Sequence, residues 1–321
     1  MNNRHVAHIE LREGITPIVA TIDCLVFDID GVLIDATESY PAAILDALKT
    51  YTMQTFPDQR ALAESFHVDD IFHFKAAGGF NDEWDLAYAG ALWIVWHALD
   101  CGAPALGDYT EAIKESGGGL AGTLAILAQH GVEQWVVSRC NKDTVMRLAQ
   151  ESYAGADACA TLFGFHAQFM TNPGRHHLER ALLPPAALEP HRGHLALYTG
   201  RNDQETDFVL KSFRLDAFFP KSLRITASSG IKKPSPKGLR ILLTSLPHRA
   251  ALFVGDTLDD ARAAERYRRL YPHSPLLFAG ITGGAMGRNS RDVFNHSGAD
   301  IIAPTTQQLL DYLQTVSEES P

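Results

Sequence analysis

A short apolar segment that ends in two carboxylates constrains this chain more than any other feature of its sequence. The segment reads Cys24-Leu-Val-Phe-Asp28-Ile-Asp30-Gly31, so residues suited to a buried strand run directly into charged ones. A strand that is apolar on both faces is typical of a parallel sheet covered by helices. We therefore expect an α/β fold with polar groups at the carboxyl end of this strand.

The second half of the chain repeats the pattern of a strand followed by a helix. Short segments that predict strands occupy residues 194–199, 222–226, 251–255, 276–279 and 300–303. Segments with helical periodicity stand between them: one runs through Phe208–Phe213, a second begins at Pro234, and a third covers Asp259–Tyr267. Alternating strands and helices predict a three-layer core with an open parallel sheet and right-handed crossovers.

The middle of the chain has mainly helical periodicity, beginning with residues 39–51 and including an aromatic-rich stretch at 84–96. A length of 321 residues is about twice the commonest domain size, which favours two domains. We expect residues 1–35 and 192–321 to form the α/β domain and residues 36–191 to form an inserted helical domain. One alternative stays open inside the insertion, because residues 134–138 also resemble a strand that ends in a hydroxyl.

Composition excludes several classes of partner. Acidic residues outnumber basic ones by 38 to 28, which argues against nonspecific binding to a nucleic-acid backbone. No apolar run approaches the length of a membrane span, so we expect no membrane partner. The four cysteines (Cys24, Cys101, Cys140 and Cys159) match no metal-ligand spacing. Together with the lack of a recognisable signal peptide, they predict reduced thiols in a cytoplasmic protein.

Reactive side chains follow several of the predicted strands. Ligands of an open parallel sheet bind beyond the carboxyl ends of its strands. The side chains expected at that edge are Asp28, Asp30, Thr199, Lys233, Asp256, Asp259 and Asp260. Crowded carboxylates require a cation, and hard oxygen ligands select Mg²⁺. A lysine, a hydroxyl and backbone N–H groups near Gly31 and Gly200 would complete a phosphate-binding site with a carboxylate nucleophile beside it.

These segments resemble the four motifs of the haloacid dehalogenase-like (HAD) hydrolases. Asp28-Ile-Asp30-Gly31 is similar to the first motif and Thr199-Gly200-Arg201 to the second. Lys233-Pro234 is similar to the third motif, and the segment from Gly255 to Asp260 to the fourth. All four stand in the family's order. The resemblance implies a Rossmann-like core of the family's fold and a mobile helical cap inserted between the first two motifs.

The resemblance also implies roles for four catalytic residues. Asp28 would be the nucleophile that forms an aspartyl-phosphate. Asp30 would protonate the leaving alcohol and then activate the hydrolytic water. Thr199 would hydrogen-bond the transferring phosphoryl group, and Lys233 would hold the nucleophile and the phosphate together. An adjacent lysine, Lys232, competes for this last role, but the residue directly before Pro234 fits the pattern better.

The metal ligands are implied in the same way. Mg²⁺ would be bound by the carboxylates of Asp28 and Asp256 and by the backbone carbonyl of Asp30. Asp260 would act through a water molecule or behind the direct ligands. Asp259 is an additional carboxylate to which the resemblance gives no role.

Substrate-binding residues are expected on both domains. In the core the candidates are Gly31, Gly200, Arg201 and Asn202, although the last two could equally begin the next helix. In the cap, the segment Gly78-Gly79-Phe80-Asn81-Asp-Glu-Trp84-Asp85 also resembles an uncharacterised subgroup of the family. Its two glycines would let a loop bend over the ligand, so Lys75, Phe80 and Asn81 are cap candidates.

Three other features are interpreted as structural. Ser138 lacks the following Gly-Arg and stands far before Lys233, so it is a poor substitute for Thr199. His176 and His177 suggest a metal site, but adjacent side chains point apart and the preceding Pro-Gly predicts an exposed loop, so we expect solvated histidines. The aromatic series Trp84, Tyr88, Trp93 and Trp96 is expected to form the cap core.

The predicted function is a Mg²⁺-dependent phosphatase for a small phosphorylated metabolite. Asp30 favours phosphate-ester cleavage, because the family's dehalogenases lack an acid at that position. Two alternatives remain: a phosphomutase or phosphotransferase that uses the same intermediate, and a catalytically silent binding module. The sequence identifies neither the substrate nor the oligomeric state.

Overall fold

The computed structural model describes residues 9–80, 82–99, 102–284 and 290–319. The chain divides into two compact units, one made of residues 1–35 and 180–321 and the other of residues 36–179. The second boundary therefore lies twelve residues before the expected position at 191/192. The intervening segment belongs with the α/β unit because Arg180–Ala181 pairs with Ile34–Asp35, and Leu183 and Leu188 lie in that unit's core.

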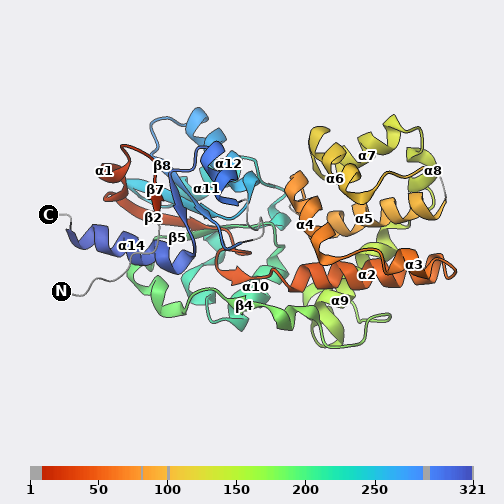
Figure 1. Cartoon of the computed structure of the whole chain (residues 1–321). Coiled ribbons are helices and arrows are strands. Elements are labelled where there is room, and N and C mark those ends of the chain that lie inside the picture. The colour runs from red at the N-terminus through yellow and green to blue at the C-terminus, as the bar shows by residue number, and fades with distance from the viewer. Residues whose placement is uncertain (1–8, 81, 100–101, 285–289, 320–321) are drawn as a thin grey trace, which may run out of the picture. The chain divides into compact units, whose positions relative to one another are not determined.

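A seven-stranded sheet forms the centre of the first unit (Figure 1). Its order is β1-β9-β8-β7-β2-β5-β6. The strands are β1 (Glu10–Leu11), β2 (Ile22–Phe27), β5 (Leu195–Tyr198), β6 (Arg224–Ile225), β7 (Ala250–Gly255), β8 (Leu276–Ile281) and β9 (Ile301–Ala303). Every pairing is parallel except that of β1 with β9. The predicted parallel sheet is confirmed, and the short antiparallel edge strand β1 was not predicted.

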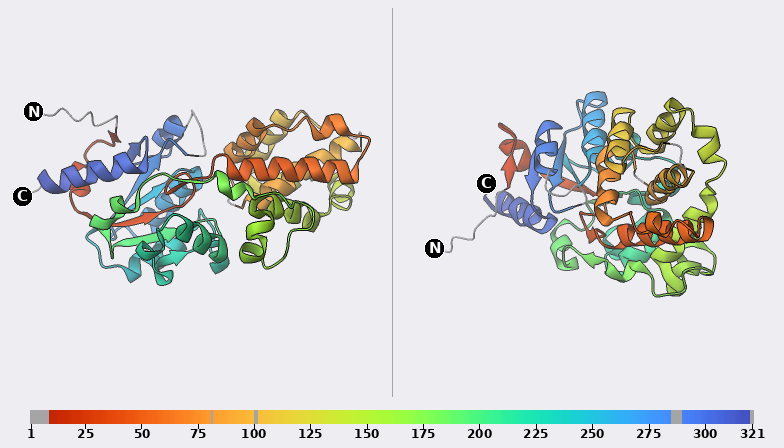
Figure 2. Two further views of the ribbon diagram at one scale, coloured as in Figure 1. Left: turned by 90° about the horizontal axis from the view of Figure 1, so that it is seen from below. Right: turned by 45° about the vertical axis from the view of Figure 1, so that its right-hand side comes forward.

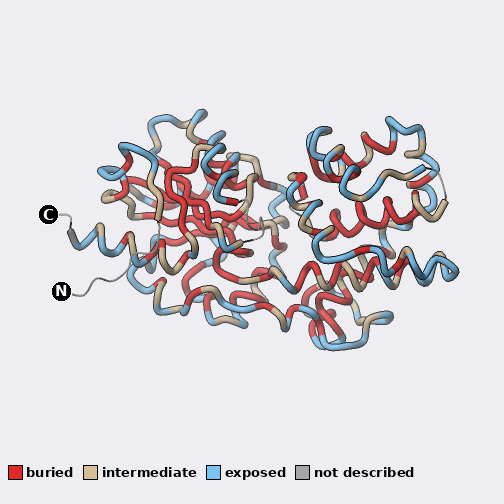
Figure 3. Tube along the Cα trace, viewed as in Figure 1, coloured by how far each residue is buried: buried red, intermediate tan, exposed pale blue. Residues whose placement is uncertain are grey.

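Strand β2 shows how the sheet separates two apolar layers. Leu25 and Phe27 join one buried cluster, whereas Cys24 and Val26 join another. Because alternate side chains of a strand point to opposite faces, both faces of the sheet must be covered. Helices α10 (Asp203–Ser212) and α14 (Thr306–Glu319) cover one face, and α11 (Lys237–Ser245), α12 (Leu258–Leu270) and α13 (Ser290–His296) cover the other. This arrangement is the predicted three-layer core, and strands β5, β7, β8 and β9 are buried along their length (Figure 3).

Smaller elements complete the unit. Helix α1 (Thr16–Val19) precedes β2, and β3 (Ile34–Asp35) and β4 (Arg180–Ala181) form a separate antiparallel pair that the sequence did not predict. The helix expected to begin at Pro234 begins three residues later, at Lys237, with Pro236 as its N-cap. The pattern identified the helix but not its first turn.

The second unit is helical, as expected (Figure 2). Its helices are α2 (Ser39–Thr55), α3 (Arg60–Ala63), α4 (Val68–Ala77), α5 (Glu83–Ala98), α6 (Leu106–Glu115), α7 (Gly119–Gln129), α8 (Glu133–Val137) and α9 (Lys142–Phe163), followed by the short 3₁₀ helix η1 (Arg175–Leu178). Helix α2 packs along α9, where Tyr40 stacks on Tyr153 with ring centroids 4.6 Å apart. Residues 134–138 lie in and just after α8, so the alternative strand is wrong.

Helix α5 forms the centre of the helical unit because it is apolar around its circumference. Trp84, Tyr88, Trp93 and Trp96 are all buried, which confirms their interpretation as core residues. Trp96 is among the largest fully buried side chains and contacts Tyr109 edge to face. A helix of this kind can be stable only when other helices surround it.

Cys24, Cys140 and Cys159 are buried free thiols, and Cys101 lies outside the described residues. Among the residues that the structure describes, no helix has both the length and the apolar character required to cross a membrane.

Candidate active site

Strand register brings the first, second and fourth motifs to one edge of the sheet. Phe27 of β2 lies opposite Leu197 of β5 on one side and opposite Val254 of β7 on the other. The residues that follow these three positions therefore leave the sheet together. Asp28 N–H donates to the Val254 carbonyl at 2.9 Å, which continues the β7 pairing by one residue. The expected strand-end positions of Asp28, Thr199 and Asp256 are thus what the fold produces.

Lys233 joins Asp28 to Asp260. Its Nζ lies 2.7 Å from Asp28 Oδ2 and 2.7 Å from Asp260 Oδ1, and all three side chains are buried. Burial disfavours the ammonium, but the charges of Asp260 and Asp28 outweigh it and raise the pKa of Lys233 above its ordinary value. Lys232 is exposed. The structure therefore brings Lys233, rather than its neighbour, to the first motif.

Asp28 is held on both of its oxygens. Oδ1 accepts a hydrogen bond from the Ile29 N–H at 2.7 Å, and Oδ2 faces Lys233. Burial raises the pKa of Asp28 to about 7; the Lys233 charge opposes this shift, and the charges of Asp260 and Asp30 add to it. A carboxylate in this setting gains stability from any further cation placed beside it.

Asp256 occupies a close backbone cradle. A Cβ atom added to Gly31 would lie 2.0 Å from Asp256 Oδ2, and one added to Gly284 would lie 2.2 Å from the same atom. Gly31 also has a φ of +70°, a conformation that disfavours other residues. The backbones at these two positions can approach the carboxylate only because both residues are glycine.

The carboxylates form a donor set suited to Mg²⁺. Asp28, Asp256 and Asp260 each offer an oxygen, and these oxygens lie within 4.8 Å of one another. With Asp30 they bring four acidic groups to the site, against Lys233 and Arg201 as the cationic groups there among the residues that the structure describes, an excess that a divalent cation would balance. Oxygen-only ligands favour Mg²⁺ over softer transition metals. The residues present therefore fit the expected ion.

Asp260 and its neighbour Asp259 have different partners. Asp260 Oδ2 accepts from the Thr257 N–H at 3.1 Å and from the Thr257 hydroxyl at 2.5 Å. The Asp260 N–H donates to Thr257 Oγ1 at 3.3 Å, and with the Thr257 N–H bond this forms the capping box of α12. Asp259 lies 3.3 Å from Arg262. Because hydrogen bonds engage both Asp260 oxygens, its carboxylate is placed to orient Lys233. The contribution of Thr257 was missed, although the Thr-x-x-Asp spacing of a capping box could have indicated it.

Asp30 is paired with Arg201. The Arg201 Nε lies 3.1 Å from both Asp30 oxygens, and Nη2 lies 2.6 Å from Asp30 Oδ1. The arginine side chain is only 1% exposed, whereas that of Asp30 is 32% exposed. Sequence reasoning left Arg201 either as a substrate contact or as part of the next helix start. It did not predict this pairing, because nothing in the second motif specifies the direction of the side chain.

The other residues of the first two motifs have mainly local contacts. Thr199 is buried, and its hydroxyl accepts the Arg201 N–H at 3.2 Å. Asn202 caps α10 by accepting the Glu205 N–H at 2.8 Å, which is the helix-start interpretation. Gly200 lies between Thr199 and Arg201 in the sequence. The Gly31 N–H donates to the Ile34 carbonyl at 2.8 Å. Phosphate binding by backbone N–H groups near Gly31 and Gly200 stays a prediction.

The cap candidates lie in the helical unit. Lys75 pairs with Glu83 at 2.6 Å, and Phe80 is buried against Phe74. Asn81 lies outside the described residues. The loop at Gly78–Gly79 packs against the loop before α7, where the Gly119 N–H donates to the Gly78 carbonyl at 2.8 Å. These contacts hold the segment within its own unit, and its part in substrate binding stays a prediction.

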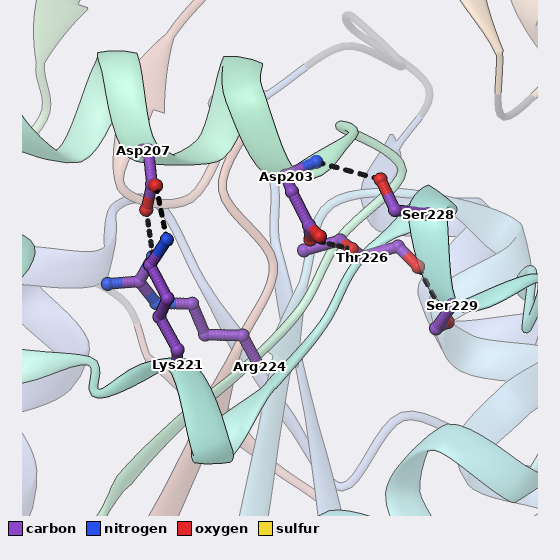
Figure 4. A pocket seen from close by; sticks show the side chains of 7 residues that line it. All are labelled: Asp203, Asp207, Lys221, Arg224, Thr226, Ser228 and Ser229. Atoms are coloured by element: carbon purple, nitrogen blue, oxygen red, sulfur yellow. Dashed lines mark hydrogen bonds and ion pairs between the residues drawn. The ribbon is translucent and has the colours of Figure 1, made fainter.

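A surface pocket beside α10 is lined by polar side chains that pair with one another (Figure 4). Asp207 pairs with Lys221 at 2.7 Å and with Arg224 at 2.6 Å. The Thr226 hydroxyl donates to Asp203 at 2.5 Å. The pocket is lined by Asp203, Asp207, Lys221, Arg224, Thr226, Ser228 and Ser229. None of the four motifs contributes a lining residue, so we assign this pocket no catalytic role.

The expectation of two solvated histidines is wrong for His176, whereas His177 is exposed as expected. His176 is buried, and its ring centroid lies 4.0 Å from that of His177. The Nε2 atoms of both rings face Asp157 Oδ2. The side chains of these adjacent residues converge because η1 is a tight turn that packs against α9. The Pro-Gly sequence before η1 did not indicate this turn.

Two solved structures share this fold at low sequence identity. Phosphatase Tt82 from Thermococcus thioreducens is 20% identical, with a TM-score of 0.59, over 92% of this chain and 99% of that chain. A predicted phosphatase from Clostridium acetobutylicum is 12% identical, with a TM-score of 0.51, over 92% and 99% of the two chains.

A curated sequence is also similar. The imidazoleglycerol-phosphate dehydratase of Phytophthora nicotianae is 24% identical over 319 residues, which cover 93% of this chain and 54% of that protein. The chain thus spans about half the length of this relative.

A family model covers most of the chain. The model for haloacid dehalogenase-like hydrolases matches residues 22–267, a range that contains all four motifs and the whole helical unit. The chain belongs to the haloacid dehalogenase-like hydrolases.

Proposed function

We propose that this chain is a Mg²⁺-dependent phosphatase that hydrolyses a small phosphorylated metabolite through an aspartyl-phosphate. One observation carries the proposal: the buried Asp28 carboxylate lies 2.7 Å from Lys233 and beside the carboxylates of Asp256 and Asp260. An ordinary structural carboxylate would be neutralised by its lysine. Among the described residues, the acidic groups here exceed the cationic ones, which supports a site that takes up a cation and a phosphate together.

In the first half of the reaction a carboxylate oxygen of Asp28 attacks phosphorus. A new O–P bond forms as the bond from phosphorus to the ester oxygen breaks, and that oxygen receives the bonding electron pair. Asp30, in its protonated form, transfers its proton to this oxygen, and the product alcohol leaves.

In the second half a water molecule attacks the phosphorus of the aspartyl-phosphate. Asp30, now a carboxylate, accepts a proton from this water. The bond between Asp28 and phosphorus breaks, its electron pair returns to the Asp28 carboxylate, and inorganic phosphate is released. The enzyme returns to its starting state once phosphate has left.

Lys233 and the metal ligands stabilise charge during both steps. Lys233 fixes the orientation of Asp28 and is placed to attract a phosphate oxygen. Asp256, Asp28 and the Asp30 carbonyl would hold Mg²⁺, which when bound offsets the negative charge of the phosphoryl group. Asp260 contributes by holding Lys233 from the opposite side.

Arg201 is proposed to position Asp30. The arginine side chain is buried, whereas that of Asp30 is partly exposed and can be reached by a leaving group. The paired arrangement keeps Asp30 beside Asp28 between catalytic events. Proton transfer to the leaving group requires Asp30 to turn at least one oxygen away from the guanidinium.

A pair of variants tests the proposal. Asp28→Asn should lower turnover of p-nitrophenyl phosphate about 10³-fold or more, because an amide cannot form the acyl phosphate. Asp259→Asn is the matched control, since this buried carboxylate pairs with Arg262, and it should keep most of the activity. Full activity in Asp28→Asn would overturn the proposal, as would turnover that chelation of Mg²⁺ leaves unchanged.

The substrate class is tested with a panel of phosphate esters. Phosphoglycolate, sugar phosphates, nucleoside monophosphates and histidinol phosphate cover the small metabolites considered, and the last resembles the phosphorylated imidazole in the name of the curated relative. Release of inorganic phosphate without an added acceptor supports a phosphatase. Transfer only in the presence of an acceptor sugar would instead indicate a phosphotransferase.

A further inference from the structure

The histidine cluster of the helical unit, defined as Asp157, His176 and His177, brings three potential metal ligands together. His177 Nε2 lies 2.8 Å from Asp157 Oδ2, and His176 Nε2 lies 3.5 Å from the same oxygen. One ligand atom from each residue lies within 4.8 Å of the other two. The cluster uses none of the residues assigned to phosphate chemistry.

We propose that the histidine cluster is a binding site for a divalent first-row transition metal ion of the Zn²⁺ type. Imidazole nitrogens with one carboxylate oxygen favour such ions over Mg²⁺ and Ca²⁺. Ligand atoms about 2.1 Å from a tetrahedral ion lie roughly 3.4 Å from one another. The 3.5 Å separation already matches this spacing, and the 2.8 Å separation would have to widen by about half an ångström.

The orientation of His176 supports the proposal. Its Nδ1 lies 3.1 Å from the Tyr153 carbonyl, which can only accept a hydrogen bond, so Nδ1 carries a proton. In a neutral ring the lone pair then resides on Nε2, the atom that faces Asp157. A backbone carbonyl that fixes the far ring nitrogen is the arrangement common behind metal-bound histidines.

The backbone around the cluster is shaped to hold it. Helix α9 is kinked at Gly155, whose φ is 63°, and a short bridge pairs Gly155 with Pro173. The Gly174 N–H donates to Asp157 Oδ1 at 3.3 Å, which leaves Oδ2 directed at the histidines. A Cβ atom added to Gly155 would lie 2.2 Å from the Gly174 nitrogen. The backbones at Gly155 of α9 and at Gly174 are therefore so close that no side chain at position 155 would fit between them.

The bound ion would therefore tie the second half of α9 to η1. Three protein ligands leave one position for water, and the exposure of His177 and Asp157 gives solvent access to the ion, their side chains being 60% and 45% exposed. Since only the folded unit brings the three ligands together, the ion would also stabilise the fold.

Zinc titration of the full-length chain tests this site. The protein is freed of metal with a chelator, supplied with millimolar Mg²⁺ to occupy the carboxylate site, and titrated with Zn²⁺ against a chromogenic competitor. Wild type should bind one Zn²⁺ that Mg²⁺ does not displace. His177→Ala and Asp157→Asn should each weaken the affinity for Zn²⁺ about tenfold or more.

Two controls keep the result interpretable. His177 is exposed, so its replacement should not prevent folding, and the variant should retain wild-type phosphatase turnover in Mg²⁺. His73→Ala removes another exposed histidine of the same unit and should bind Zn²⁺ like wild type. Co²⁺ at the histidine cluster should give the intense visible absorption of a tetrahedral nitrogen-ligated ion. Failure of wild type to bind Zn²⁺ in Mg²⁺, or equal binding by His177→Ala, would overturn the proposal.

Discussion

The two polar clusters of this chain are assembled in opposite ways. The active-site cluster, comprising Asp28, Asp30, Arg201, Lys233, Asp256 and Asp260, gathers residues more than two hundred positions apart at one sheet edge. The histidine cluster gathers residues twenty positions apart at a helix kink. Residues far apart in the sequence could be predicted to lie together because the parallel register of the strands fixes their positions. The residues of the histidine cluster are close in the sequence, yet the sequence did not indicate that their side chains converge. The comparison teaches that register is more predictable than an irregular backbone.

The clusters also differ in what balances their charge. The active-site cluster already contains an ammonium, which pairs with the buried carboxylates of Asp28 and Asp260, and a guanidinium, which pairs with the partly exposed Asp30. The histidine cluster has one carboxylate facing two imidazoles. Loss of a cationic side chain should therefore be severe in the first cluster, while the second should respond mainly to metal ions.

Among variants that remove a cationic side chain, the largest effect is expected from the loss of Lys233. Lys233→Met leaves Asp28 and Asp260 buried without their shared cation, and breaking such a buried arrangement costs about 3–5 kcal/mol. Turnover should fall about 10²-fold or more because charge at phosphorus is no longer stabilised. Urea unfolding and steady-state kinetics measure the two effects. Lys232→Met is the control. An equal loss of stability and turnover in both variants would contradict the role given to Lys233.

The next prediction concerns Arg201. Arg201→Met releases Asp30 from its paired position, so the general acid is less well placed. Turnover of an alkyl phosphate, whose leaving oxygen needs a proton, should fall about 10²-fold. Turnover of p-nitrophenyl phosphate, with its better leaving group, should fall much less. Equal losses for both esters would show that Arg201 acts on something other than proton transfer.

Glycine variants compare the two clusters directly. Gly31→Ala places a methyl group against Asp256, and the Mg²⁺ concentration needed for half-maximal activity should rise about tenfold, by analogy with other disturbed metal sites. Gly193 also has a positive φ, +88°, and a Cβ atom added there would meet no atom within 4 Å, so Gly193→Ala controls for backbone strain alone. Gly155→Ala should instead weaken Zn²⁺ binding and leave Mg²⁺ activation unchanged. Loss of Mg²⁺ activation in Gly155→Ala would break the separation between the clusters.

The smallest effect is a shift in pH dependence. Burial raises the pKa of Asp28 to about 7 from the ordinary 3.8, and only the ionised carboxylate is a nucleophile. At limiting Mg²⁺, kcat/KM should therefore fall as pH decreases through about 7. Saturating Mg²⁺ favours the carboxylate and should move this decline to lower pH. Profiles of kcat/KM against pH measured at two Mg²⁺ concentrations test this shift. A decline at the same pH at both concentrations would contradict it.

Sequence patterns were informative where regular structure determines position. The apolar segment before Asp28 predicted a buried strand, and the parallel sheet carries Asp28, Thr199 and Asp256 to one edge as expected. The aromatic residues of α5 were correctly expected in a core. In these cases one repeating backbone geometry fixes which side of an element each residue occupies.

The patterns failed where individual side-chain directions or irregular backbone decide the outcome. The pairing of Arg201 with Asp30 depends on a side-chain direction that no motif encodes. The close approach of Gly284 to Asp256 depends on the loop after β8, and the convergence of His176 and His177 depends on the kink at Gly155. The return to the α/β unit was placed too late because β4 has only two residues.

Trapping the intermediate tests the central claim most directly. The protein is quenched with acid during turnover, reduced with borohydride, digested and analysed by peptide mass spectrometry. An aspartyl-phosphate at Asp28 would be reduced to homoserine, so the mass of the peptide containing residue 28 should fall accordingly, and the change should be absent without substrate. Reduction at another residue, or none during demonstrable turnover, would contradict the account.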